Sequence, residues 1–366
     1  MKLVPTFLLF LTSLIYSFCA FSQDEKSILP VDSFLEVNVK AANKGDVTTY
    51  EDLFGLDFYL QNKTIGIEQR SKKDNTSFKY KPNSDLAIGL GFSYRYVVLG
   101  GTINLFSIKS AEKLKTRSFD FQSQLASRRF LSIISAVFYK GFYADNPLLN
   151  VPSGGYYIRP DIGVSILGLD NMYAFNPKYS FRGSMLRFQR MKKSAGSALV
   201  SYNTSYMLKS ADSSFVPKVL QNSFEDFDLR RIRIWNVALG AGYAYTWVIN
   251  KQFLVSGIVN ANVPLNFLKT QNESGQNDHQ IKTGFDINMW LRASYERDIW
   301  ALSVDYRNSK MVDASDEFNS TLGLNYGLAR VIFSRRFGLK RETKKMLKPF
   351  DRLLDIPRNI FNKKKK

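Results

Sequence analysis

Eight charged residues are spaced so that their side chains could form ion pairs with one another or bind a polar ligand. If the segments that hold them are strands, all eight share one face: Arg95, Arg159, Asp161, Asp286, Arg292, Glu296, Asp305 and Arg307. On the inner wall of a closed sheet, such groups either line an aqueous path or neutralise one another in a packed interior. We therefore expect them to line a lumen. Their balanced charge favours an ion-pair network, and the alternative is a selectivity or substrate patch.

The sequence offers little for catalysis. Nucleophilic catalysis needs a nucleophile, a base and a group that orients the base. The single histidine, His279, follows Asp278 in a stretch rich in Asn, Gln and Gly, where we expect an exposed loop, and no Gly-x-Ser-x-Gly elbow occurs. The single cysteine, Cys19, lies within the N-terminal segment 1–22, which we expect to be a cleaved signal peptide, and no divalent-metal motif stands out. We expect no enzyme, no cofactor and no metal site.

An alternation of period two indicates the element that holds the charged residues. From Ile232 to Ile249 one face is apolar with aromatic residues at each end, and the other is small and weakly polar. Ten residues at about 3.3 Å each, tilted by ~40°, span roughly 25 Å, the height of the apolar band of an outer-membrane barrel. The same pattern recurs in residues 85–96, 156–166, 283–296 and 300–307. The expected membrane-interface aromatics are Trp235, Tyr245, Trp247, Trp300 and Tyr306.

Connections of two lengths separate these segments, as short periplasmic turns and long outer loops do in barrels. Tight joints fall near Val97, Ser127, 250–251 and 297–298. Long polar connections cover 71–84, 109–116, 209–231, 265–281 and 310–319. Weaker strand patterns include 180–190, and the alternation of loops also requires a short strand near 171–176. The sequence predicts an all-β fold: a single antiparallel transmembrane β-barrel of about 12–14 strands, with a short basic C-terminal helical tail.

The N-terminus predicts export. Lys2 precedes an apolar run from Leu3 to Tyr16, and small residues Ala20 and Ser22 fit a cleavage site, which is typical of a secretory signal peptide. We predict a signal peptide at 1–22, a periplasmic extension at 23–46, a barrel at 47–337 and a basic amphipathic tail at 338–366. The predicted location is the cell outer membrane.

The formal net charge of +19 would suit a protein that binds nucleic acid. We do not expect a nucleic-acid partner, because the chain is predicted to be exported. Anionic lipid headgroups and lipopolysaccharide suit such a surface. Residues 338–366 hold 11 Lys and Arg against three acids. In the tail, Met346, Leu347, Phe350, Leu353 and Leu354 recur at helical spacing. This pattern predicts a periplasmic or membrane contact through the tail, and the alternative is a solvated extension.

Several short motifs resemble those of a known family. Tyr80-Lys-Pro82-Asn83 is followed by the glycine-rich segment Leu86–Tyr96, and Tyr173-Ala-Phe175-Asn176 is followed by Lys193–Ser197. With Gly240–Tyr243, these motifs are similar to the Gram-negative domain-of-unknown-function family numbered 4421. The resemblance covers about residues 45–337 and implies an outer-membrane barrel without any assigned activity, ligand or catalytic residue. Phe337 resembles the terminal aromatic residue that barrel-assembly machinery recognises, although 29 residues follow it.

Two functions fit this sequence. The first is a narrow pore or small-solute transport barrel in the outer membrane. The alternative is a structural or envelope-interaction barrel with a closed lumen that binds a partner through its loops or tail. Small residues and balanced charge on the predicted inner face lean toward a narrow or plugged interior. The expected partners are outer-membrane lipid and lipopolysaccharide, and barrel-assembly machinery during folding.

Overall fold

A computed structural model gives the fold of this chain. It describes residues 35–36, 42–50, 53–71, 73–74, 76–83, 86–106, 116–145, 149, 155–224, 228–313, 320–341, 343–345 and 347–348. The chain divides into two units. One comprises residues 40–336, and the other comprises 1–39 together with 337–366.

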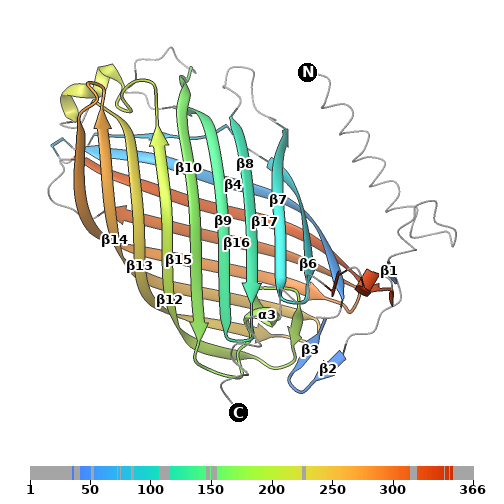
Figure 1. Cartoon of the computed structure of the whole chain (residues 1–366). Coiled ribbons are helices and arrows are strands. Elements are labelled where there is room, and N and C mark those ends of the chain that lie inside the picture. The colour runs from blue at the N-terminus through green and yellow to red at the C-terminus, as the bar shows by residue number, and fades with distance from the viewer. Residues whose placement is uncertain are drawn as a thin grey trace. The chain divides into compact units, whose positions relative to one another are not determined.

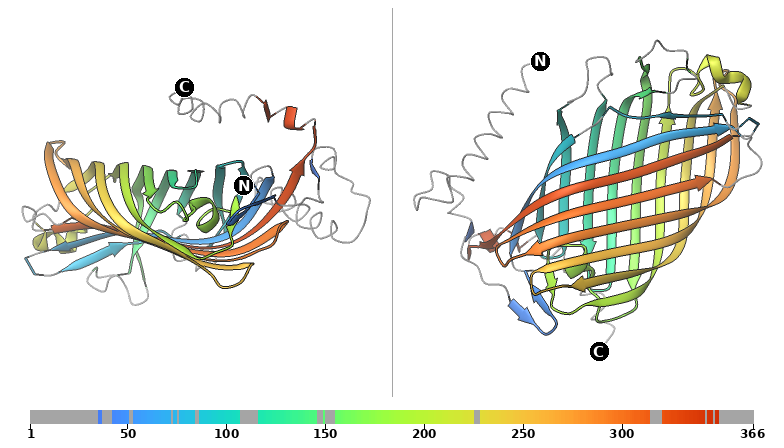
Figure 2. Two further views of the ribbon diagram at one scale, coloured as in Figure 1. Left: turned by 90° about the horizontal axis from the view of Figure 1, so that it is seen from below. Right: turned by 180° about the vertical axis from the view of Figure 1, so that it is seen from behind.

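The larger unit contains a closed antiparallel ring of strands. One sheet of 14 strands closes because β17 also pairs with β4, and its two outermost members, β1 and β5, are short additions to β17 and β4. Twelve strands therefore make the ring, within the predicted range, and Figures 1 and 2 show them side by side. The ring strands are β4 (Phe54–Ser71), β6 (Leu86–Tyr94), β7 (Val97–Phe106), β8 (Arg117–Ala126), β9 (Phe130–Ala144), β10 (Tyr157–Ala174), β12 (Ala195–Ser210), β13 (Leu229–Val248), β14 (Phe253–Asn272), β15 (Asn277–Glu296), β16 (Trp300–Asp313) and β17 (Ser320–Leu339).

The ring has two distinct ends. We call the end with the short turns β6–β7, β8–β9, β13–β14 and β15–β16 the turn end, and the opposite end the loop end. The loop end carries β5 (Ser77–Tyr80) and the 3-10 helix η2 (Lys218–Ser223). The turn end carries α3 (Phe181–Ser184) and a small sheet of β2 (Ala42–Lys44), β3 (Val47–Thr49) and β11 (Gln189–Met191). Figure 1 shows η2 near the top and α3 near the bottom.

The outer face of the ring is apolar. On β13, Trp235, Leu239, Tyr243 and Trp247 are each more than half exposed, whereas the intervening Asn236 is 4% exposed. Neighbouring strands repeat this order, which is the inverse of a soluble barrel with its apolar core inside. An exposed apolar surface of this extent marks contact with a membrane or a partner. Within the described residues, no helix is long and apolar enough to cross a membrane.

Two strand predictions between residues 171 and 190 are wrong. Residues 171–174 continue β10, so no extra strand is needed there, and 180–190 form α3 and β11 instead of a barrel strand. Asn176-Pro177 ends the strand, because proline cannot donate a ladder hydrogen bond and the Asn176 side chain accepts from the Lys178 amide in a turn. The apolar residues beyond this turn are buried, so their pattern does not reflect contact with lipid.

A bulge in β10 reverses the predicted faces of that strand. Pairing with β9 shifts between Arg159 and Gly163, where Pro160 lacks an amide proton. Ile158 is 40% exposed on the outside, but Ile162 and Val164 are fully buried, although alternation alone placed all three on one face. The bulge thereby directs apolar side chains into the ring.

Two further predictions are wrong because strands begin or end at other residues than expected. The predicted loop 265–281 is a continuation of β14 and β15, which leaves a turn at residues 273–276 and places His279 on β15. Arg95 is not on the inner face of a strand. It lies in the β6–β7 turn with a φ of 54°, and its guanidinium lies 6.0 Å from the centre of the Tyr96 ring.

In the smaller unit, β1 (Leu35–Glu36) pairs with Gly338 and Leu339. The Lys344 amide donates to the Lys340 carbonyl, as in a helix. The predicted signal peptide and the tail residues Met346, Phe350, Leu353 and Leu354 lie outside the described residues.

The depth of an outer-face residue in the membrane should decide how much an introduced arginine lowers the free energy of unfolding. Leu239 lies near the middle of the segment from Trp235 to Tyr245, whereas Ile281 lies at the loop end, two strands away from Trp235 in the same cross-strand row. The two side chains are 65% and 66% exposed. We expect Leu239→Arg to lower the free energy of unfolding in lipid vesicles by about 2–4 kcal/mol and Ile281→Arg by about 0–1 kcal/mol. Denaturant titration measures both, and equal losses would contradict a membrane band centred on Leu239.

Candidate functional site in the barrel lumen

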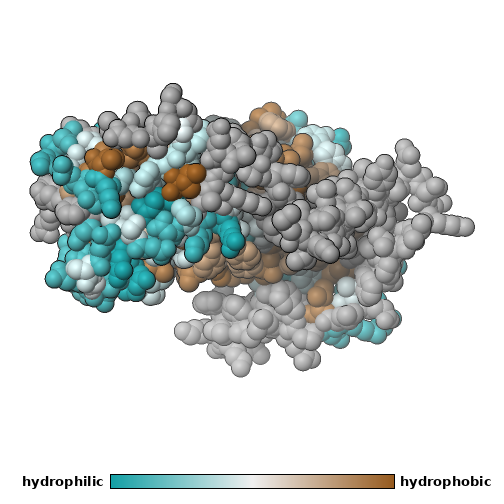
Figure 3. All heavy atoms as spheres, turned by 90° about the horizontal axis from the view of Figure 1, so that it is seen from above, coloured by the Kyte–Doolittle hydropathy of each residue, from teal (hydrophilic) through white to brown (hydrophobic). Residues whose placement is uncertain are grey.

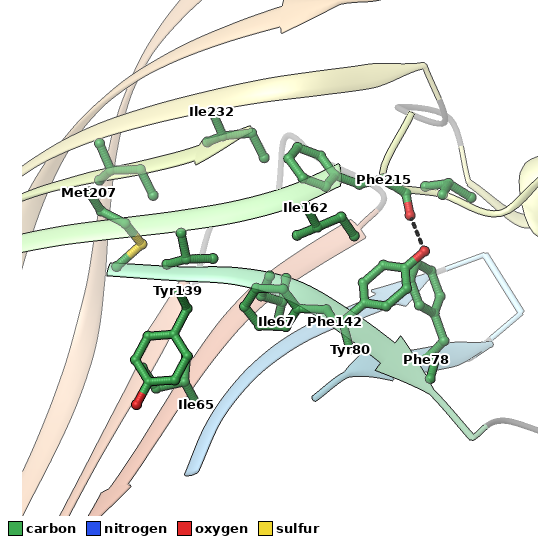
Figure 4. Close-up of a cluster of buried hydrophobic side chains, with 14 of the residues drawn as sticks. Ile65, Ile67, Phe78, Tyr80, Tyr139, Phe142, Ile162, Met207, Phe215 and Ile232 are labelled. Atoms are coloured by element: carbon green, nitrogen blue, oxygen red, sulfur yellow. Dashed lines mark hydrogen bonds between the residues drawn. The ribbon is translucent and has the colours of Figure 1, made fainter. Parts of the chain in front are cut away.

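The loop end of the lumen is filled by an apolar cluster. Phe78 and Tyr80 of β5 and Phe215 of the β12–β13 connection pack against inward residues of the wall such as Ile67 and Phe142 (Figure 4). The Tyr80 hydroxyl donates a 2.8 Å hydrogen bond to the Phe215 carbonyl. These side chains are at most 2% exposed. We call residues 76–83 and 211–224 the loop-end cap.

Polar contacts hold the loop-end cap to the wall. Arg159 donates to both oxygens of Asp161 at 2.8 Å and to the Ser214 carbonyl at 2.7 Å. Asp161 in turn accepts from the Asp212 amide at 3.0 Å. Two residues predicted as lumen lining are therefore brought together by the fold, and they fasten a connection across the lumen.

The exposed edge of the loop-end cap is also fastened. Hydrogen bonds from the Ser223 side chain and from Thr76 lower the pKa of Asp74 to about 2, so this carboxylate stays ionised in mildly acidic solution. The contact joins the β4–β5 connection to η2, because Ser223 is the last residue of that helix.

The turn end is filled by a different segment. Residues 175–194, between β10 and β12, turn inward and bury Tyr179, Phe181 and Met185 against wall residues that include Leu131 and Trp290. Tyr179 and Phe181 meet edge to face with ring centres 5.3 Å apart, and the Ser184 hydroxyl donates to the Tyr179 hydroxyl at 2.8 Å. We call residues 175–194 the turn-end plug.

Arginines anchor the turn-end plug to the wall. Arg187 of the plug forms a buried ion pair with Asp57 of β4, whose side chains are 9% and 2% exposed. Arg292 of β15 donates to the Met185 carbonyl at 2.7 Å. Arg336 of β17 pairs with Glu296 at 2.6 Å and also donates to the Arg187 carbonyl at 3.3 Å.

Tyr50 completes this end. The Tyr50 amide donates to the Phe188 carbonyl, and the Arg336 guanidinium lies 3.9 Å from the centre of the Tyr50 ring. Burial raises the pKa of Tyr50 to about 12, so its hydroxyl stays protonated in neutral solution. The segment before the barrel thus takes part in holding the plug.

Further ion pairs lie along the inner wall. Lys63 pairs with Asp120, Arg307 pairs with Asp170 at 3.1 Å, and Arg292 lies 3.8 Å from Asp305. The inner wall therefore carries cations beside anions, as charges taken out of water require. Asp286 is also inward and 7% exposed.

The predicted residues differ in what they touch. Arg159, Asp161, Arg292 and Glu296 contact the cap, the plug or a group that holds the plug, while Asp305 and Arg307 belong to wall pairs. The five aromatic residues predicted at the membrane interface differ in exposure. On the outer face, Trp235, Trp247 and Tyr306 are 57%, 58% and 41% exposed, and Tyr245 and Trp300 are half-buried.

Sequence reasoning missed several buried charged residues of the inner wall and the plug. Alternation along residues 54–71 would have found Asp57 and Lys63, since both are buried on β4. No periodic signal points to Arg187, because it lies in the plug, and its partner Asp57 is 130 positions earlier in the chain.

A polar chamber remains between the two fillings. Its volume is about 130 Å³, and its wall includes Asp170, Arg307, Asn203, Asn288 and Ser205. The buried Oδ1 of Asn203 has no hydrogen-bond partner among the described residues. Polar cavities of this size hold several water molecules or one small polar solute.

The fold and its lumen define a class: an antiparallel β-barrel of the membrane-spanning type, with an interior filled by its own chain. The chain belongs to the family described as "Domain of unknown function (DUF4421)", whose model matches residues 47–333, which confirms the resemblance. No curated protein sequence matches the chain. Within the described residues, no group of three or more His, Cys, Asp or Glu side chains could hold a metal ion.

Several solved structures are similar to this chain at low identity. OmpT, an outer membrane protein of Vibrio cholerae, is 7% identical with a TM-score of 0.28, over 81% of this chain and 100% of that one. The outer membrane protease OmpT from Escherichia coli is 8% identical with a TM-score of 0.34, over 80% and 98%. The Pseudomonas putida toluene transporter TodX is 10% identical with a TM-score of 0.28, over 78% and 89%.

The Arg187–Asp57 pair should dominate the stability of the turn-end plug. Arg187→Met leaves Asp57 buried without its counter-charge, so we expect the free energy of unfolding to fall by about 3–5 kcal/mol. Replacing both partners, with Arg187→Met and Asp57→Leu, should recover most of this loss. Denaturant titration of a double-mutant cycle in vesicles measures these values.

Lys193→Met is the matched control. Lys193 pairs with Asp46 at 3.2 Å, but the side chains are 80% and 53% exposed. A pair in water contributes little, so a change below about 1 kcal/mol is expected. Equal losses for Arg187→Met and Lys193→Met would show that the plug does not depend on the buried pair.

Proposed function

We propose that this protein is an outer-membrane barrel with a closed lumen, which acts through its two ends and does not conduct solutes. The exported N-terminus expected from the sequence and the apolar outer face support this location. Short turns face the periplasm in such barrels and long loops face outward. The turn-end plug then lies on the periplasmic side, and the loop-end cap faces the exterior.

One observation carries the proposal: two separate parts of the chain fill the lumen, one from each end. The loop-end cap buries Tyr80 and Phe215, and the turn-end plug buries Tyr179 and Phe181, all at 2% exposure or less. In a pore, side chains packed in the lumen would obstruct the passage of solutes. In a structural barrel, the same packing would keep the surfaces at the two ends rigid. Its role is that of a structural or envelope-interaction barrel.

Planar-bilayer recording tests the closed lumen. The purified full-length protein should insert and show no stable conductance steps, because the loop-end cap and the turn-end plug would block an aqueous path. Insertion is verified separately by heat-modifiable migration on a denaturing gel. Stable open steps from verified, folded protein would contradict the proposal.

The polar chamber favours a second candidate, a gated transport barrel for a small polar solute. In that case, the loop-end cap would be the gate, and Arg159, which holds the Ser214 carbonyl, would be its latch. The chamber wall holds an anion and a cation, Asp170 and Arg307, and a bound zwitterion would replace their mutual ion pair with one contact to each.

Arg159→Ala separates the two candidates. A closed barrel should still exclude arabinose in a liposome-swelling assay, because the turn-end plug keeps its own contacts. A gated barrel should swell faster with Arg159→Ala than with the control Lys81→Ala, which breaks only the exposed pair between Lys81 and Asp145. Faster swelling specific to Arg159→Ala would favour transport over the closed barrel.

A further inference from the structure

Three basic side chains stand together on the outer face of the barrel at the loop end. Arg231 and Arg233 lie on β13, and Lys269 lies on β14 directly opposite Arg233 in the strand register. All three share the face of Trp235 and Phe267, which are 57% and 43% exposed, while the alternating Ile232 and Leu268 are buried inside. We call these three residues the basic triad.

The basic triad begins where the apolar band ends. Tyr206, Trp235, Phe267 and Ile281 form one cross-strand row, with the Tyr206 and Trp235 rings 5.0 Å apart. Arg233 and Lys269 lie in the next row outward, roughly 7 Å farther along the strands. The aromatic row therefore marks the depth of the membrane interface, and the triad lies at the depth of headgroups.

A second part of the ring has the same order. Phe119 of β8 and Phe138 of β9 have ring centres 6.2 Å apart on the outer face, and Arg117 and Lys140 are paired in the row beyond them. The boundary between apolar and basic rows thus recurs away from the triad.

The charges of the basic triad are not neutralised by the protein. Among the described residues, Arg231, Arg233 and Lys269 form no ion pair, although Arg231 donates to Gln271 at 3.3 Å. Besides one another, their partners in the strand register are Leu208, Ser210, Gln271 and His279, none of them acidic. Figure 3, which views the molecule from the loop end, shows hydrophilic side chains gathered in one broad area of this end.

We propose that the basic triad binds the phosphate groups of a lipid A-type glycolipid in the outer leaflet. This inference rests on the proposed outer-membrane location and orientation. Neighbouring strands lie about 4.8 Å apart, so Arg233 and Lys269 can approach one phosphate from two sides. A guanidinium matches phosphate oxygens in a bidentate fork. The acyl chains of the same molecule would lie against Trp235 and Phe267 below.

The test compares lipids on the purified full-length protein in detergent, by native mass-spectrometric titration. The probe is hexa-acylated lipid A with two phosphates, and the comparison lipids are its dephosphorylated form and phosphatidylglycerol. Wild-type protein should prefer the diphosphorylated glycolipid. The combined variant Arg231→Ala, Arg233→Ala and Lys269→Ala should bind it at least about tenfold more weakly. A tenfold change in affinity corresponds to roughly 1.4 kcal/mol of binding free energy.

The control removes the same charge at the other end. The control variant combines Lys192→Ala, Lys193→Ala and Lys251→Ala, at three residues of the turn end. It should leave the affinity for lipid A unchanged. Equal weakening in both variants, unchanged binding in the triad variant, or equal wild-type affinity for phosphatidylglycerol would overturn the proposal. Heat-modifiable migration verifies that each variant is folded. Cell fractionation tests the location independently, so either inference can fail without the other.

Discussion

The physical constraint on which this structure depends is that charges inside a membrane barrel must be neutralised by the barrel itself. The outer face meets hydrocarbon, so the polar residues that alternate with it must point inward. An ionised group there loses water and is stable only beside an opposite charge and additional hydrogen-bond donors or acceptors. Arg187 with Asp57, and Arg336 with Glu296, satisfy this requirement with buried side chains.

Two further ion-paired arginines of the wall contact the segments that fill the lumen. Arg292 reaches the carbonyl of Met185 in the turn-end plug, and Arg159 reaches the carbonyl of Ser214 in the loop-end cap. Each guanidinium has more donors than one carboxylate can accept, so the remaining donors bind backbone carbonyls of the fillings. The same residues therefore balance charge and hold the fillings to the wall. Apolar clusters around Tyr80 and Tyr179 pack the two ends of the lumen.

The sequence predicted the elements whose pattern is local. Alternation in residues 232–249 and 283–296 separates an apolar outer face from a polar inner face, because side chains of a strand point to opposite sides. It failed where apolar residues point inward. Alternation cannot distinguish Ile162, which fills the lumen after a bulge, from Ile158, which faces outward. The turn-end plug resembled a strand for the same reason, and the pairing of Arg187 with Asp57 joins distant segments that no local pattern relates.

The accessibility of the polar chamber tests the closed lumen most directly. Cys19 is the only cysteine and lies in the predicted signal peptide, so single cysteines can be introduced into a mature chain without thiols. Ser205→Cys places a thiol at the chamber, and Asn277→Cys places one on an exposed residue at the loop end. In folded protein in vesicles, a membrane-impermeant maleimide should modify Asn277→Cys rapidly and Ser205→Cys only after unfolding. Modification of both thiols at the same rate in the folded protein would contradict a closed lumen.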